Sequence, residues 1–110
     1  MTISKLLHSN VKHWVEVIEG AIDYDETDGY EDIFDYLAQS FLDITYTVSG
    51  DGRLLGAEVL VAFGGPTIYI NTMRGAVEGF WGTERLSMSY NDTIGLEDWI
   101  IESNPINLTP

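Results

Sequence analysis

Residues 44–81 read ITYTVSGDGRLLGAEVLVAFGGPTIYINTMRGAVEGFW, and this stretch decides the fold. It opens by alternating apolar residues with threonine, the pattern of a strand with one buried face. The segment that ends in VLVAF is apolar on both faces, as expected of a central strand. Turn-forming SGDG, GGP and MRG interrupt the apolar runs. The stretch therefore predicts four strands, at 44–48, 54–63, 67–71 and 76–81.

Helices are predicted on both sides of this strand run, and residues 85–90 add a candidate fifth strand. A first helix is indicated by apolar residues at helical spacing, with Ser9 or Asn10 as its cap and an end near Asp23. Its predicted buried stripe is Val11, Trp14, Val15, Ile18, Ala21 and Ile22.

A second helix is predicted to begin at Asp28, because Asp28 and Glu31 have the spacing of a capping box. Its predicted apolar stripe is Tyr30, Ile33, Phe34, Leu37, Ala38 and Phe41. A last short helix is expected over 92–102, capped by Asn91 or Asp92 and stopped by Asn104-Pro105.

The predicted class is α+β in a single domain, residues 1–110. Two N-terminal helices precede an antiparallel meander of four to five strands, because turns this short join antiparallel neighbours, and a short C-terminal helix follows. The chain has no cysteine, which favours a reducing cytoplasm. No apolar run is long enough for a signal peptide or a membrane span, so we expect a soluble protein of the host cytoplasm.

Charge is the most informative bulk property of the chain. Eighteen acidic residues face five basic ones, for a formal net charge of −13. Such a field repels nucleic acid and anionic membrane surfaces and attracts basic proteins. We therefore expect no direct binding of nucleic acid and no membrane contact, and we expect a basic partner protein.

The placement of the acidic residues matters more than their number. Ten of the eighteen lie between Glu16 and Asp43, and no lysine or arginine interrupts this segment. On the first predicted helix, acids follow i, i+3, i+7 spacing on the side opposite the apolar stripe. The candidate partner-binding residues are Glu16, Glu19, Asp23, Asp25, Glu26, Asp28, Glu31, Asp32 and Asp35.

Carboxylates on rigid helices can imitate the phosphates of a nucleic acid, because charge-assisted pairs with arginine and lysine form with either group. The alternative is an interaction module, such as a homodimer, whose acidity only serves solubility. Four aromatic residues of the strand region are candidates for core positions or for exposed interface anchors. They are Tyr69, Phe80, Trp81 and Tyr90.

No catalytic, cofactor or metal motif is complete in the sequence. Residues 23–29 have the composition of a calcium loop, but no register supplies both the glycine at position six and the glutamate at position twelve. His8 and His13 are off the i, i+4 spacing of a helical zinc pair. Neither a nucleophile elbow nor a phosphate-binding loop occurs. We expect no cofactor, no metal and no catalytic residue, and a small hydrolase or metal-dependent enzyme is the least favoured reading.

The segments Leu60–Thr72 and Gly75–Gly82 resemble the core of short acidic accessory proteins from phages, prophages and plasmids. The acidic two-helix start and the short last helix extend the resemblance over most of the chain. The resemblance implies a mobile-element origin, and small acidic proteins of that origin include anti-CRISPR and anti-restriction inhibitors. It supplies no binding residues to carry over.

Charge and resemblance together predict an inhibitor that binds a nucleic-acid-binding defence complex, foremost a CRISPR-Cas effector. The acidic face would occupy the basic groove and block access of DNA or RNA.

Overall fold

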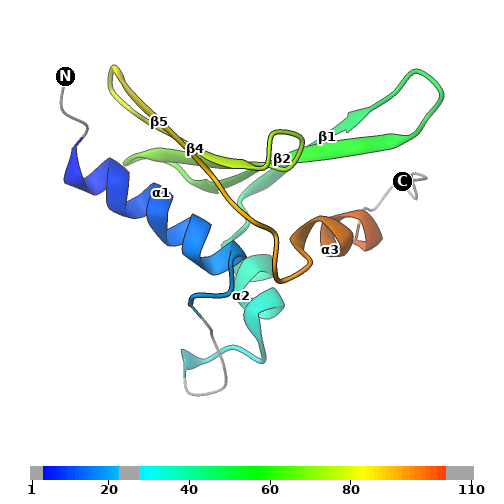
Figure 1. The fold of residues 1–110 in the computed structure, drawn as a ribbon, viewed down its shortest axis with the longest axis horizontal. Coiled ribbons are helices and arrows are strands. Elements are labelled where there is room, and N and C mark those ends of the chain that lie inside the picture. The colour runs from blue at the N-terminus through cyan, green and yellow to red at the C-terminus, as the bar shows by residue number, and fades with distance from the viewer. Residues whose placement is uncertain (1–3, 23–27, 104–110) are drawn as a thin grey trace.

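The computed structural model describes residues 4–22 and 28–103. It confirms the α+β class, with three helices and one five-stranded sheet in the described part of the chain (Figure 1). In chain order the elements are α1 (Lys5–Ile18), α2 (Ile33–Ser40), β1 (Asp43–Val48), β2 (Leu54–Ala62), β3 (Thr67–Asn71), β4 (Ala76–Trp81), β5 (Glu84–Ser89) and α3 (Leu96–Glu102).

The sheet is an antiparallel meander, in which the spatial order of the strands is their order in the sequence. The bounds predicted for β3 and β4 are confirmed residue for residue, and β5 confirms the fifth strand. Register shifts between Thr47 and Val48 and between Leu60 and Ala62 disturb β2 on both sides. Such bulges increase the local twist of a sheet.

All three helices lie on one face of the sheet (Figure 1). Helix α1 packs against β4 and β5, and α3 packs against β2. The core between the layers is aliphatic, with Val59, Ile68, Ile70 and Val77 of the sheet fully buried beneath helical residues such as Leu7. Among residues 4–22 and 28–103, no helix lies over the opposite face of the sheet.

Helix α1 begins and ends earlier than the sequence predicted. Its N-cap is Ser4, whose hydroxyl accepts a hydrogen bond from the N–H of Leu7. Ser9 and Asn10, the predicted caps, instead donate from their side chains to the carbonyl of Leu6 within the helix. The helix stops at Ile18, because Gly20 adopts a φ of 75° that ends the helical path.

The predicted stripe of α1 is confirmed over 11–18 and wrong at Ala21, which is exposed. Leu7 and Val17 are also buried, because the helix starts before the predicted cap. The predicted end near Asp23 is wrong, because the helix ends at Ile18.

Helix α2 begins at Ile33, so Asp28 is not its cap. Its N-cap is Asp32, in extended conformation, and Leu37 is its one fully buried residue, whereas Ala38 is exposed. Helix α3 begins at Leu96, later than predicted. The Asp92 carboxylate still serves this helix, because it accepts hydrogen bonds from the N–H groups of Leu96 and Glu97. The predicted stop at Asn104-Pro105 lies outside the described residues.

Two aromatic clusters join the helices to one another. Trp14 of α1 stacks on Tyr36 of α2, with ring centroids 5.7 Å apart. Trp99 of α3 lies 5.3 Å from Phe34 and 5.6 Å from Phe41, between centroids. The helices therefore form one continuous layer under the sheet. Within the described residues, none of them is long and apolar enough to cross a membrane.

Candidate functional site

Six of the nine predicted partner-binding carboxylates lie in the described structure, at the end of α1 and around the start of α2. They are Glu16, Glu19, Asp28, Glu31, Asp32 and Asp35. Asp23, Asp25 and Glu26 lie outside the described residues. Several of these six also serve the fold.

Asp32 and Asp35 bind the backbone at the start of α2. The Asp32 carboxylate accepts a hydrogen bond from the Asp35 N–H at 2.9 Å, and the Asp35 carboxylate accepts one from the Glu31 N–H at 3.0 Å. The Gln39 side chain also donates to Asp35. The Glu31 N–H and then the Gln39 amide hold the pKa of Asp35 below its ordinary value. Both carboxylates satisfy N–H groups at a helix start, so part of the predicted acidic face is structural.

Glu16 and Glu19 also have partners within the molecule. Glu16 lies 3.6 Å from the ammonium of Lys12, one helical turn away. The Glu19 carboxylate accepts a hydrogen bond from the N–H of Asn91 at 3.0 Å and so ties the end of α1 to the segment before α3. An exposed pair such as Lys12–Glu16 contributes little stability, so Glu16 stays available to a partner.

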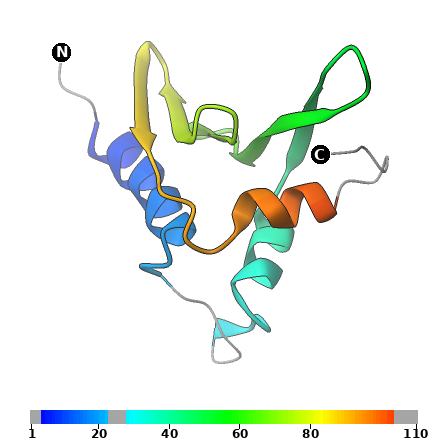
Figure 2. The same cartoon turned by 45° about the vertical axis from the view of Figure 1, so that its right-hand side comes forward.

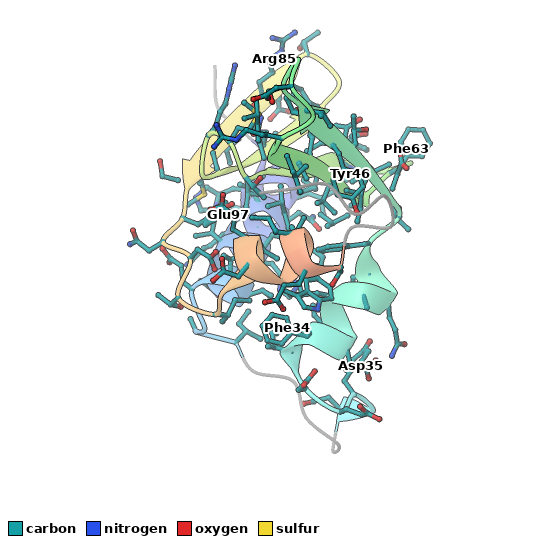
Figure 3. All side chains as sticks on the ribbon, turned by 90° about the vertical axis from the view of Figure 1, so that its right-hand side faces the viewer. Phe34, Asp35, Tyr46, Phe63, Arg85 and Glu97 are labelled. Atoms are coloured by element: carbon teal, nitrogen blue, oxygen red, sulfur yellow. The ribbon has the colours of Figure 1, made fainter. Side chains whose placement is uncertain are left out.

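Helix α3 adds acidic residues that were missed from the sequence. Glu97, Asp98 and Glu102 are exposed on α3, and the contacts of Trp99 place this helix beside α2. Figure 3 shows Glu97 on α3 and Asp35 on α2, both on the helical side of the molecule. Only the fold brings these residues near the first acidic segment, because some sixty positions separate them in the chain.

We define the acidic helical side as the described carboxylates of the helices and their connections. They are Glu16, Glu19, Asp28, Glu31, Asp32, Asp35, Asp92, Glu97, Asp98 and Glu102. Exposed Glu31 and Glu97 differ from the capping residues, because neither carboxylate accepts a hydrogen bond within the described part of the chain.

Charge is segregated between this side and the sheet. Residues 44–90, the strand run, hold four acids and three arginines, whereas the rest of the chain holds fourteen acids and two lysines. Figure 3 shows Arg85 on the sheet, at the end of the molecule opposite Asp35. Asp43, the first residue of β1, adds a fifth acid to the sheet, so the sheet is weakly negative and most of the negative charge of the chain lies outside the strands.

The uncovered face of the sheet, which we call the open face, combines aromatic and charged side chains. The register places Leu60, Tyr69 and Glu78 in one row across β2, β3 and β4, with Phe80 next to that row. The Tyr69 and Phe80 rings meet edge to face at 6.3 Å, and the Arg85 guanidinium lies 5.8 Å from the Phe80 centroid. These are half-buried or exposed positions with no helix over them.

The aromatic residues left undecided by the sequence are divided by the structure. Tyr69 and Phe80 lie on the open face, and Trp81 is 39% exposed at the end of β4. Tyr90 packs against the core, where burial, Asp92 and Glu97 raise its pKa to about 12. The alternation of Tyr69 with the buried Ile68 and Ile70 is the sequence signal that could have placed Tyr69.

Two hollows open on the sheet. One, of about 260 Å³, is lined by residues that include Glu58, Asn71 and Arg74, and the other, of about 340 Å³, by residues that include Phe80 and Arg85. Across residues 4–22 and 28–103, no three His, Cys, Asp or Glu side chains are grouped to hold a metal ion. In the same residues no charged side chain is buried.

Comparisons with protein-family models, with curated proteins and with solved structures found no match to this chain.

Proposed function

We propose that this chain is a non-catalytic inhibitor that binds a nucleic-acid-binding protein through its acidic helical side and excludes DNA or RNA. The observation that supports the proposal is the segregation of charge, with fourteen acids and two lysines outside the strand run. A groove that pairs arginines and lysines with phosphates pairs them equally well with carboxylates.

The helical layer can present these carboxylates as a rigid set. The stacked Trp14 and Tyr36 fix α1 against α2, and Trp99 fixes α3 against α2. A rigid array loses little entropy on binding, which favours affinity. Capping residues such as Asp32 hold the helix starts and add to the same negative field, while Glu31 and Glu97 are free to pair with a partner's cations.

The partner class follows from the resemblance to small acidic proteins of mobile elements. Small acidic proteins of that origin include inhibitors of host defence, so the proposed target is a CRISPR-Cas effector, whose positively charged channel holds nucleic acid. A protein with a net charge of −13 would be drawn to such a channel over long range.

The test is competition for DNA on purified CRISPR-Cas effector complexes, followed by the anisotropy of a labelled target duplex. We expect the chain to displace DNA at ~0.1 M salt and much less at ~0.5 M, because salt screens exposed charges. Glu31→Lys with Glu97→Lys should weaken the inhibition at least about tenfold.

The matched control is Asp51→Lys with Glu58→Lys, which changes the net charge equally but on exposed positions of the strand run. Circular dichroism must show that both variants fold. The proposal fails if no effector in the panel loses DNA, or if the two double variants inhibit equally well.

A further inference from the structure

The open face of the sheet is proposed as the site where a second copy of this chain binds. The surface is unpartnered, and the repulsion between two chains of net charge −13 is strongest over the helical sides. The strand run is close to neutral and carries all three arginines. It is therefore the part of the molecule over which two copies can approach at the lowest electrostatic cost.

The shape of the sheet suits a symmetric pair. Figure 2 shows the β1–β2 hairpin and the β4–β5 hairpin rising away from the helices at opposite ends of the sheet. These hairpins lie at diagonal corners, because β1 and β5 run in the same direction through the meander. A twisted sheet of this kind is a saddle. A rotation of 180° about an axis along the central strand places the raised corners of one sheet over the low corners of the other. The open face is therefore complementary in shape to a second copy of itself.

The charges fit the same two-fold axis, drawn along β3. Asp43 and Arg85 both belong to the open face and lie near the starts of β1 and β5, the two edge strands at the same end of the sheet. Rotation about this axis places β5 of one copy over β1 of the other and leaves each end of the sheet at the same end. Arg85 of one copy therefore lies over the Asp43 edge of the other. Within the described part of the chain, neither side chain forms an ion pair of its own.

The reach of this pair is adequate. The row of paired residues that contains Asp43 crosses β5 at Ser87, two positions from Arg85. Two positions along a strand span about 6.6 Å, which an arginine side chain covers. The same rotation brings Tyr69 over its own copy and Glu78 of each copy over Leu60 of the other. Phe80 lies two positions further along β4, so aromatic and apolar residues meet near the axis together with Glu78.

The size of the face is that of a modest dimer interface. Strands of five to nine residues at about 3.3 Å per residue and about 4.8 Å apart give roughly 500 Å² in projection. The accessible surface of packed side chains is larger than its projection, and a standard interface takes about 800 Å² from each partner. A reversible, concentration-dependent dimer is expected.

The test is sedimentation equilibrium of the full chain from ~5 to ~200 µM, which should show a monomer–dimer equilibrium. Arg85→Asp and Asp43→Arg should each weaken the dimer at least about tenfold, because each places like charges at both symmetric contacts. Mixing the two variants should restore a heterodimer, since each contact then joins opposite charges. The double variant in one chain should likewise restore the homodimer.

Two control variants test whether the loss of dimer comes from the Arg85–Asp43 contact or only from the change in net charge. Lys5→Asp and Asp98→Arg make the same charge changes at exposed positions of the helical layer and should leave the dimer nearly unchanged. A wild-type chain that stays monomeric at ~200 µM would overturn the proposal. Failure of the mixed variants to reassociate would overturn the two-fold arrangement. The inference does not rest on the proposed function, because the acidic helical side lies on the outside of such a dimer.

Discussion

The two faces of the sheet are built from alternate residues of the same strands, yet they differ in nearly every property. On β3, Ile68 and Ile70 point into the aliphatic core and are fully buried, whereas Tyr69 lies between them on the open face. The covered face packs against α1 and α3, and none of the buried residues described there is charged; Glu84, at its edge, accepts a hydrogen bond from the Ser4 N–H at the start of α1. The open face mixes aromatic rings with Glu78 and Arg85.

This difference shows how a domain of 110 residues can separate folding from recognition. Close packing on one face supplies the stability, and the period of two leaves the other face free to vary. Substitutions at matched positions of the two faces should therefore have unequal effects on stability.

Two strand glycines give the largest expected contrast. A Cβ at Gly79 would lie 2.5 Å from Val11 Cγ2 and 2.7 Å from Leu7 Cδ1, where α1 presses on β4. A Cβ at Gly56 would clash with the Met73 side chain, but Met73 is 55% exposed and can move away. Gly79→Ala should cost about 1–3 kcal/mol of unfolding free energy through overpacking, and Gly56→Ala less than about half of that.

Urea unfolding followed by tryptophan fluorescence measures both variants. Equal losses would show that the open face is packed as rigidly as the covered one, which would contradict the division between the faces.

The close approach at Gly79 also explains where sequence reasoning worked and where it did not. The limits of β3 and β4 were predictable because Gly64-Gly65-Pro66 and Arg74-Gly75 are local turn signals that act within a few residues. The start of α1 was not predictable in this way. Ser4 and Ser9 can both cap a helix, and the choice follows from packing Leu7 against Gly79, more than seventy positions away.

The sequence predicted which segment of the candidate site is acidic, but not which carboxylates would contact the backbone or lie near one another. The sequence shows the acidic segment directly, but the start of α2 decides which of its carboxylates bind backbone N–H groups. Because the helix begins at Ile33, Asp32 and Asp35 take that role at its start. Glu97 joins the acidic side only through the packing of Trp99 on Phe34.

A second prediction divides the acidic helical side into carboxylates that hold the fold and carboxylates that only face solvent. Asp32→Ala removes the hydrogen bond to the Asp35 N–H and should cost about 0.5–2 kcal/mol, whereas Asp32→Asn keeps a capping oxygen and should cost less. Glu31→Ala, at the adjacent exposed position, should change stability by less than about 0.5 kcal/mol.

Thermal unfolding at fixed pH and salt ranks the three variants. A loss in Glu31→Ala as large as that in Asp32→Ala would mean that the whole acidic side is structural, and it would weaken the proposed function.

The smallest expected effect is a pH dependence of the free energy of unfolding that arises in the helical layer and not on the open face. His13 Nε2 forms a hydrogen bond of 2.9 Å with the Tyr36 hydroxyl, and its ring meets Trp14 edge to face. Burial lowers the pKa of His13 below 6.5, and the nearby Glu16 offsets part of this shift. The folded state therefore binds this proton less readily than the unfolded state. The stability contribution is present above the unfolded pKa and is lost as pH falls through the folded pKa.

Wild-type unfolding free energy should therefore fall between about pH 7.5 and pH 5.5, and His13→Gln should reduce that fall. Both histidines of the chain belong to α1 and not to the open face, so self-association should stay constant by sedimentation. A fall in stability that is the same in wild type and His13→Gln would remove His13 as its source. Dimerisation that follows pH in step with stability would mean that the two faces of the sheet are coupled.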